Sequence, residues 1–393
     1  MPATPPPARP APDLGSPWVE SPFFEELLAA RALAPADAER ARAFHEQGFL
    51  VLPDFFPAAQ VDAVRAAVEP LFADGVEDPR RSPNRFQDAW RDRPPVAAMA
   101  TDPRLLELLA ALYGRRPIPF QTLNFRRGSE QRAHADTIHF SSLPSGYMCG
   151  VWVALEDVGP ANGTLVYYPG SHRLPDVDFD SLGLRVINYN RPGDLEALTY
   201  QDYERYEDFT ARRMAAAGLE PVALEAPRGT ALVWAAGLVH GGGPILDPAS
   251  TRWSQVTHYY FADCVYYAPI FSNLATGDLY LKRVVDVATG EGVPHRYRGL
   301  PLPDLPADGA YKLVLDVDDV GADRVRLVSN YEIKHLAGDN AYLRGVRDEN
   351  ANLWRAKNDL EAAIAAIERS PSHKLARLLT APARALRRRR AAG

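Results

Sequence analysis

The sequence predicts an α+β protein, mainly β with helices, in which helices come first, a β-rich region follows and a long amphipathic helix lies near the C-terminus. Three observations predict this class. Helical periodicity extends to about residue 114, short aromatic and β-branched runs follow between residues 117 and 267, and a heptad pattern starts after residue 340. We therefore expect a β-sandwich or barrel that is preceded by helices and interrupted by a helical insertion.

Composition and charge limit the class of protein further. The 393 residues are 46% hydrophobic and 24% charged, which excludes disorder over the whole chain. Only Cys149 and Cys264 are present, so a disulfide framework or a Cys-rich zinc site is excluded. No apolar run is long enough to span a membrane, and the first residues lack the apolar region of a secretory signal. We expect a cytoplasmic protein.

The N-terminal third is predicted to be a proline-rich arm followed by three helices. Residues 1–17 contain seven prolines and predict a disordered arm. The helices are expected near residues 36–47, 57–72 and 102–113, and a short buried strand, FLVLPDFF, lies between the first two. Gly48 and Gly114 follow two of these helices, where a left-handed residue commonly ends a helix.

The predicted main domain spans residues 18–335 and contains an insertion near residues 176–218. The part from 195 to about 217 has helical character, whereas the flanking runs are typical of short strands. These runs are PIPFQTLNFRRG, GYMCGVWVALEDVG, TLVYYPGSH, GTALVWAAG and WSQVTHYYFADCVYY.

The C-terminal region is predicted to be an amphipathic helix, residues 340–369, and a basic tail, residues 370–393. Apolar residues recur every seven positions, so the helix either packs on its own domain or forms a coiled coil with a second copy through residues 343–367. The seam consists of Leu343, Val346, Asn350, Leu353, Lys357, Leu360, Ile364 and Ile367.

The tail carries seven basic residues and no acid between Lys374 and Arg390, whereas the rest of the chain has a formal charge of −13. Such a tail is either solvated, or it contacts a partner or an anionic membrane surface. In the last case the protein would lie at the inner face of the membrane. Specific nucleic-acid binding is not expected, because the body is acidic and the tail has no interleaved aromatic residues.

Two histidines and a carboxylate predict a metal site. His134 and Asp136 lie two residues apart in a β context, so both side chains can face one metal. His240 ends an apolar strand and precedes three glycines that permit a close backbone approach. Two imidazoles and one carboxylate form the facial triad that suits non-haem Fe(II). Arg252, near the start of the next strand, could hold a carboxylate.

Two further histidines are harder to assign. His139 lies five residues after His134, an odd offset that turns it away from the metal on a strand, although it could line the substrate pocket. His258 shares a face with Arg252 and is either a pocket residue or a core histidine.

These residues carry a family resemblance. The sequence resembles the phytanoyl-CoA dioxygenase family of Fe(II)/2-oxoglutarate oxygenases over roughly residues 36–265. The matching pieces are FHEQGFLVLPDFF, HADTIHF, VWVALEDVGPANGTLVYYPGSHRLP and VHGGGPILDPASTRWS. The resemblance implies a double-stranded β-helix, or jelly roll, buttressed by helices. The tail is similar to Arg-rich ends of bacterial enzymes of polysaccharide assembly, so a polysaccharide or secondary-metabolite pathway is an expected setting.

The resemblance also implies roles for individual residues. His134, Asp136 and His240 would bind Fe(II), and Arg252, assisted by Ser254, would bind 2-oxoglutarate. Gln121, Asn124 and Trp152 would lie near 2-oxoglutarate or substrate. The implied reaction consumes O2 and 2-oxoglutarate, releases succinate and CO2, and hydroxylates an unactivated C–H bond of a small or carrier-linked metabolite. Halogenating relatives replace the carboxylate ligand with a small residue, so Asp136 favours hydroxylation.

Two other functions remain open for the same residues. A catalytically inactive jelly-roll binding module is expected to have lost a ligand or the arginine, and this sequence retains both. A metal-dependent hydrolase or isomerase could use the triad but would have no use for Arg252. Metal analysis together with dependence on 2-oxoglutarate would separate the three functions.

Overall fold

The computed structural model describes two units, one within residues 1–328 and one within 329–393, and each is considered by itself. The described residues are 15–179, 181–184, 195–274, 277–297, 299–305, 309–317, 323–329 and 341–370.

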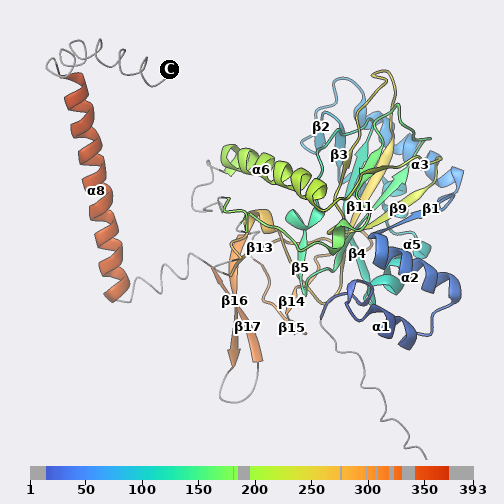
Figure 1. Ribbon diagram of the computed structural model, residues 1–393, viewed down its shortest axis with the longest axis horizontal. Coiled ribbons are helices and arrows are strands. Elements are labelled where there is room, and N and C mark those ends of the chain that lie inside the picture. The colour runs from blue at the N-terminus through green and yellow to red at the C-terminus, as the bar shows by residue number, and fades with distance from the viewer. Residues whose placement is uncertain are drawn as a thin grey trace, which may run out of the picture. The chain divides into compact units, whose positions relative to one another are not determined.

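A seven-stranded antiparallel sheet forms the centre of the first unit (Figure 1). Its strands, in spatial order, are β1 (Phe49–Leu52), β9 (Ala231–Ala235), β6 (Met148–Ala154), β11 (Ser254–Phe261), β4 (Pro117–Phe125), β3 (Arg85–Gln87) and β2 (Arg81–Ser82). Every residue of the central strands β6 and β11 is buried, so both faces of the sheet must be covered. This explains why these strands read as continuous apolar and aromatic runs in the sequence.

Helices from the N-terminal third cover one face of the sheet. They are α1 (Phe24–Ala30), α2 (Pro35–Gln47), α3 (Ala58–Val68), α4 (Pro94–Ala100) and α5 (Pro103–Tyr113), with 3-10 turns η1 (Trp18–Glu20), η2 (Glu69–Phe72) and η3 (Ala89–Arg91). One apolar cluster joins these helices to the inner residues of the strands. The three predicted helices are confirmed. Gly48 and Gly114 take φ values of 81° and 73°, so both end their helices in the left-handed conformation.

The structure describes only the last three residues of the predicted arm, residues 15–17. Residues 1–14 lie outside the described part of the chain, but Pro17 is buried and leads directly into η1. Trp18 of this turn packs in the main core and donates an indole hydrogen bond of 3.0 Å to the carbonyl of Ala111. Proline content alone could not reveal that the last residues of the arm are anchored by the tryptophan that follows.

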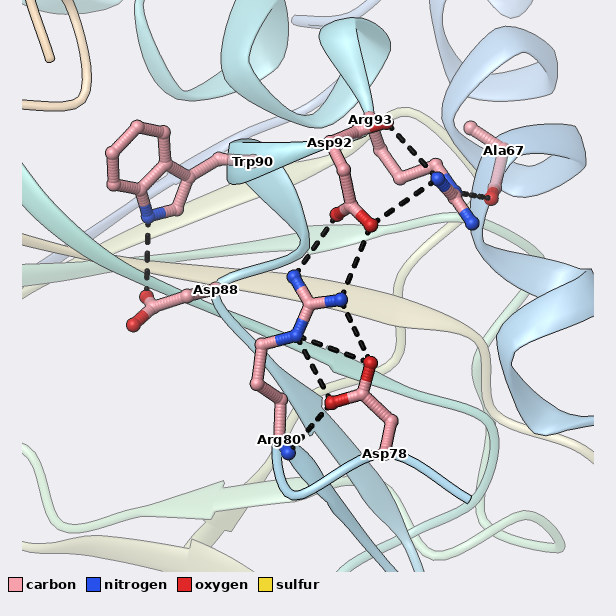
Figure 2. Close-up of polar contacts among 7 residues, drawn as sticks. All are labelled: Ala67, Asp78, Arg80, Asp88, Trp90, Asp92 and Arg93. Carbon is pink, nitrogen blue, oxygen red and sulfur yellow. Dashed lines mark hydrogen bonds and ion pairs between the residues drawn. The ribbon is translucent and has the colours of Figure 1, made fainter. Parts of the chain in front are cut away.

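A polar cluster fixes the outer edge of the sheet, where β2 and β3 form a hairpin. Figure 2 shows the Arg80 guanidinium between two carboxylates, with contacts of 2.8 Å to Asp78 and 3.0 Å to Asp92. These hydrogen bonds lower the pKa of Asp78 to about 2, so the cluster is charged at neutral pH. Asp88 accepts a hydrogen bond of 3.2 Å from the Trp90 indole, and its backbone N–H binds the carbonyl of Thr122 on β4. The hairpin is therefore tied to both η3 and β4.

A smaller antiparallel sheet lies across the other face of the central sheet. It consists of β10 (His240–Gly242), β7 (Leu165–Tyr167) and β8 (Val222–Ala223). Residues of both sheets form a second apolar cluster, which includes Trp152, Leu165, Trp234 and Val256. The fold is thus a double-stranded β-helix core with helices on its outer face, as the family resemblance implied.

A third sheet combines one earlier strand with strands from beyond Cys264, and the sequence indicated only the first of these later strands. Its strands are β17 (Asp323–Ser329), β16 (Gly309–Val317), β13 (Asp278–Leu281), β12 (Val265–Tyr267) and β5 (Ser141–Leu143), and β14 (Arg296–Tyr297) pairs separately with β15 (Leu300–Pro301). The inserted helix α6 (Leu195–Ala216) lies between β7 and β8 in the chain (Figure 1).

The second unit contains helix α8 (Ala341–Arg369), which covers the predicted heptads. Large apolar side chains of this helix are exposed, among them Leu353, Trp354, Leu360 and Ile364. Within the described residues, no helix combines the length and the apolar character that crossing a membrane requires. The basic tail from residue 371 onward lies outside the described part of the chain.

Candidate active site

A cavity of about 520 Å³ lies between the central sheet and the smaller sheet. Five strands of the central sheet contribute side chains to its wall, namely Arg85, Gln87, Gln121, Leu123, Phe125, Trp152, Trp234, Val256 and His258. Side chains of β10 and of the segment before η4 (Asp136–Ile138) close the opposite side. The predicted metal ligands lie on this cavity wall, so the cavity is the candidate active site.

The structure brings His134, Asp136 and His240 together. One ligand atom from each lies within 4.8 Å of the others, and all three residues are buried. The two histidines form an isolated β-bridge in which each backbone N–H donates to the other's carbonyl at 2.9 Å. This bridge places their imidazole rings side by side, with ring centroids 4.6 Å apart.

Asp136 reaches the site from a 3-10 turn rather than from a strand. His134 belongs only to the isolated bridge, and Asp136 begins η4. The prediction that both residues share the face of one strand is therefore wrong in its geometry, although the two side chains do converge. The turn rather than strand alternation brings the carboxylate beside the imidazoles.

The glycines after His240 allow the close backbone approach that the sequence suggested. A Cβ on Gly241 would lie 2.7 Å from the Gln131 carbonyl oxygen, and a Cβ on Gly242 would lie 2.7 Å from the Glu130 nitrogen. No side chain larger than hydrogen fits at either position without a backbone shift. The segment leading to His134 can thus pack directly on β10.

Hydrogen bonds set the tautomer of both histidines. Nδ1 of His134 lies 2.8 Å from the carbonyl of Arg132, and Nδ1 of His240 lies 3.0 Å from the carbonyl of Leu238. Because a carbonyl can only accept, each Nδ1 carries a proton, which leaves Nε2 as the ring nitrogen that can bind a metal. Burial and the neighbouring His240 also lower the pKa of His134 to about 3, which keeps its imidazole neutral.

The third ligand is held in its charged form. Burial alone would raise the pKa of Asp136, but the nearby histidines, led by His240, and the Trp234 indole lower it overall. The indole N–H donates to Oδ2 at 2.8 Å, while Oδ1 lies 3.9 Å from Nε2 of His240. Two imidazoles and one carboxylate form a donor set suited to a divalent first-row metal.

Gly150 is what allows Trp234 to reach Asp136. The two residues pair across β6 and β9, and a Cβ on Gly150 would lie 2.1 Å from the indole ring. The ring can cover β6 only because this position lacks a side chain. A residue 84 positions before the tryptophan in the chain thereby helps to orient a metal ligand.

Arg252 is a buried cation without a carboxylate partner among the described residues. The residue is 2% exposed, Nη1 donates to the Gly163 carbonyl at 3.0 Å, and Nε has no hydrogen-bond partner there. Burial lowers its pKa to about 10, so it stays charged at neutral pH. An unpaired buried charge is unfavourable, which makes this position suited to an anion that enters the cavity.

The remaining predicted residues divide into two groups. Trp152 lines the cavity, and its indole nitrogen has no hydrogen-bond partner among the described residues. Gln121 also lines the cavity, where its Oε1 accepts a hydrogen bond of 2.9 Å from His258. Ser254 is fully buried and does not line the cavity, although its hydroxyl is likewise unpartnered in the described part of the chain.

Asn124 lies on the wrong face of the sheet for the predicted role. Its amide donates to Oε1 of Gln255 at 3.3 Å, and Gln255 in turn donates to the Val96 carbonyl on α4. Both side chains therefore point to the helices and away from the cavity. The physical reason is strand alternation, because Asn124 is an odd number of residues from Gln121.

Both additional histidines line the cavity, which is one of the alternatives that the sequence left open. His258 lines the cavity, and its Nε2 lies 3.7 Å from Oδ2 of Asp136. His139 lines the cavity too, and its Nε2 lies 3.0 Å from the hydroxyl of Tyr203 on α6. The even spacing between Arg252 and His258 was the available signal for the first. The contact with α6 had no sequence signal.

The inserted helix supports the segment that carries two of the metal ligands. The hydroxyl of Tyr206 accepts a hydrogen bond of 3.3 Å from the backbone of Ala135, between His134 and Asp136. Arg132 forms ion pairs with Glu207 and Asp208 on the same helix. Helix α6 therefore buttresses the candidate metal site.

The fold and the site together define a jelly-roll protein with a buried metal-ligating triad and a buried cation. A family model described as phytanoyl-CoA dioxygenase (PhyH) matches residues 44–252, more than half of the chain. The chain belongs to the phytanoyl-CoA dioxygenase family.

Similar proteins are consistent with this assignment. An ectoine dioxygenase from Sphingopyxis alaskensis is 31% identical over 156 residues, which cover 36% of this chain and 51% of that protein. A phytanoyl-CoA dioxygenase domain-containing protein 1 from Mus musculus is 30% identical over 99 residues, covering 24% of this chain and 34% of that protein. The chain thus spans about half or less of the length of these two relatives.

Two solved structures are similar to this chain at low sequence identity. The epimerase SnoN in complex with Fe3+, alpha ketoglutarate and nogalamycin RO has a TM-score of 0.46 and 23% identity, covering 68% of this chain and 98% of that one. EctD from S. alaskensis with 2-oxoglutarate and 5-hydroxyectoine has a TM-score of 0.41 and 22% identity, covering 57% of this chain and 76% of that one.

Proposed function

We propose that this protein is an Fe(II)- and 2-oxoglutarate-dependent dioxygenase that hydroxylates an unactivated C–H bond of a small or carrier-linked metabolite. Membership of the family supports the oxygenase class. The observation that carries the proposal is the pairing, in one cavity, of the triad with the unpaired Arg252. A hydrolase would need the metal ligands but would have no use for this buried cation.

The residues present fit both groups chemically. Nε2 of His134, Nε2 of His240 and the Asp136 carboxylate would hold Fe(II) and leave other coordination positions open. Arg252 would bind a carboxylate of 2-oxoglutarate through its free Nε and through Nη groups that the Gly163 carbonyl does not occupy. The bound metal would supply the activation of O2 that couples 2-oxoglutarate decarboxylation to substrate oxidation.

The protein would contribute by positioning the metal ligands and by excluding water from the cavity. The backbone bonds between His134 and His240 fix two ligands, and the Trp234 indole orients the third. The apolar side chains of Leu123, Phe125 and Val256 line the cavity and would exclude water from the side of the metal that they face. Because Asp136 occupies the carboxylate position of the triad, hydroxylation is favoured over reactions that need that position for another ligand.

Binding of 2-oxoglutarate by an Arg252→Gln variant tests the proposal. The Fe(II)-loaded protein, kept anaerobic, is titrated with 2-oxoglutarate by calorimetry, and succinate release is then measured in air. Loss of a buried charge partner should weaken 2-oxoglutarate binding roughly thirtyfold or more.

Arg116→Gln is the matched control, because Arg116 is paired with Asp286 and does not line the cavity. It should bind 2-oxoglutarate like the unmodified protein. Failure of the Fe(II)-loaded wild-type protein to bind 2-oxoglutarate or to release succinate would show that the proposed function is wrong.

A further inference from the structure

Two cations at the cavity, Arg85 and Lys282, have no role in the proposed chemistry. Arg85 lies on β3 and Lys282 directly follows β13, so they reach the cavity from the central sheet and from the third sheet. Neither has an ion-pair partner or a side-chain hydrogen bond among the described residues. Both are close enough to the His139 ring to act on its charge.

Nearby cations behave differently. Arg80, on the same hairpin as Arg85, binds two carboxylates, and Arg116 is paired with Asp286. The chain contains 50 acidic and 44 basic residues, so acidic partners are not scarce. Two unpaired cations at one cavity are therefore a local feature and do not reflect a basic protein.

The charges of the cavity can be counted. Asp136 is the one acidic residue on its described lining, where the cations are Arg85, Arg252 and Lys282. In the proposed complex, the two charges of Fe(II) and the one of Arg252 are balanced by Asp136 and the two carboxylates of 2-oxoglutarate. Arg85 and Lys282 remain without a counter-charge, and a substrate anion would supply it.

The Arg85 side chain is presented by a fixed element. The hairpin that carries it is tied down by the Asp78–Arg80–Asp92 cluster (Figure 2), and Arg85 pairs in register with Phe125 of β4. Gln87, two residues further on, faces the cavity as well. A positioned cation loses less conformational freedom on binding than one on a mobile loop.

The neighbouring walls indicate the rest of the ligand. Phe140, Ile270 and Phe271 line the same cavity and are apolar. From this arrangement we propose that the substrate carries an anionic group, a carboxylate or a phosphate, that binds Arg85 and Lys282 while its apolar part lies against these side chains. This inference rests on the proposed function for the charge count, and names the substrate class of the same site.

Simple alkyl probes test the inference. Hexanoate, hexyl phosphate and the neutral hexanamide are titrated by calorimetry into the anaerobic Fe(II)-loaded protein saturated with 2-oxoglutarate. At least one anion should bind about tenfold tighter than hexanamide, since a hydrogen bond between two charged groups strengthens binding by about that factor or more. The tighter of the two anions distinguishes a carboxylate from a phosphate substrate.

Variants locate the effect. Arg85→Gln and Lys282→Gln should each reduce anion affinity about tenfold without changing the affinity for 2-oxoglutarate, and Arg85→Lys should retain most of it. Arg283→Gln, which removes a charge beside Lys282 but outside the cavity lining, should have no effect. Equal binding of all three probes, or unchanged anion binding in both glutamine variants, would overturn the inference.

The two proposals can fail separately. Should 2-oxoglutarate fail to bind, the proposed function is wrong, and the same probes added to metal-loaded protein alone still show whether Arg85 and Lys282 select anions. Should 2-oxoglutarate bind normally and the anions show no preference, only the inference about the substrate is wrong.

Discussion

The cavity of the first unit and the helix of the second depart from ordinary burial in opposite ways. In the cavity, polar and charged side chains such as His134, Asp136 and Arg252 are buried. On α8, large apolar side chains are exposed, with Leu353 at 62% and Leu360 at 66%. Each departure is unfavourable for the isolated chain, so each points to something the chain binds. The cavity fits a cation and anions, whereas the helix fits another apolar surface.

The two regions also differ in how their side chains are held. Each residue of the triad has a fixed partner: a carbonyl for His134 and for His240, and an indole for Asp136. The described residues of α8 from 352 onward are mostly exposed, and their contacts are those of a surface helix, such as the Lys357–Glu361 pair. A preorganised site can bind a small ligand at little entropic cost, whereas the helix would gain order from a partner.

The largest effect should come from removing the charged ligand of the preorganised site. The variant Asp136→Ala retains only the two imidazoles as ligands. These bind a divalent metal less tightly than the complete triad does, because no carboxylate remains to balance part of the metal's charge. We expect the affinity for Fe(II) to fall roughly a hundredfold or more, and succinate release to fall to background. Removing only a residue that hydrogen-bonds to a metal ligand typically lowers metal affinity about 10–100-fold, and removing the ligand itself should have a larger effect. Metal content after dialysis and a succinate assay check this.

The matched control is Asp88→Ala, which removes a carboxylate from the outer edge of the sheet and leaves the triad intact. It should keep its metal. Full retention of Fe(II) by Asp136→Ala would mean that the buried polar residues have a structural role. The cavity would then not be a preorganised binding site.

A smaller effect is expected when only the orientation of that ligand is changed. Trp234→Phe keeps an aromatic ring over Gly150 but removes the 2.8 Å hydrogen bond to Asp136. Fe(II) affinity should fall about tenfold to hundredfold, and adding more metal should restore succinate release.

Activity that stays low at saturating metal would show that the indole acts on substrate or cosubstrate instead of on the ligand. Trp90→Phe serves as the control, since it removes an indole hydrogen bond to Asp88 at the sheet edge. Its metal affinity should not change.

Features of the cavity and of α8 that depend on local residue patterns could be predicted from the sequence. The His134–Asp136 spacing, the glycines after His240 and the heptads of α8 are all readable along the chain. Strand parity indicated the cavity face for His258, and the same rule, applied to Asn124 and Gln121, would have excluded Asn124.

Other features depend on contacts between distant segments. The bridge between His134 and His240 joins residues 106 positions apart, and the Gly150–Trp234 contact joins two strands through pairing that no motif announces. Arg85 and Lys282 meet at one cavity only because a hairpin and a third sheet pack beside it. Such positions follow from tertiary packing, so local residue patterns could not have predicted them.

Changes to the apolar face of α8 should have the smallest effect on catalysis. They should instead change the oligomeric state of the protein. We propose that this helix pairs with a second copy through residues 343–367, because Leu353 and Leu360 lie one heptad apart and are exposed. Leu353→Glu combined with Leu360→Glu should convert the full chain from a dimer or higher oligomer to a monomer, as measured by sedimentation over a range of concentrations. Succinate release should stay within about twofold, because the catalytic residues all lie in the first unit.

Ala362→Glu is the matched control, since it adds the same charge to α8 outside the heptad seam and should leave the oligomer intact. Asn350 adds a second test, because a polar residue in the seam sets register and oligomer number at the expense of stability. Asn350→Leu should therefore give a more stable assembly with a broader range of sizes. A wild-type chain that sediments as a monomer at every concentration would contradict pairing between two copies of α8. The exposed leucines of α8 would then have to pack against a different surface.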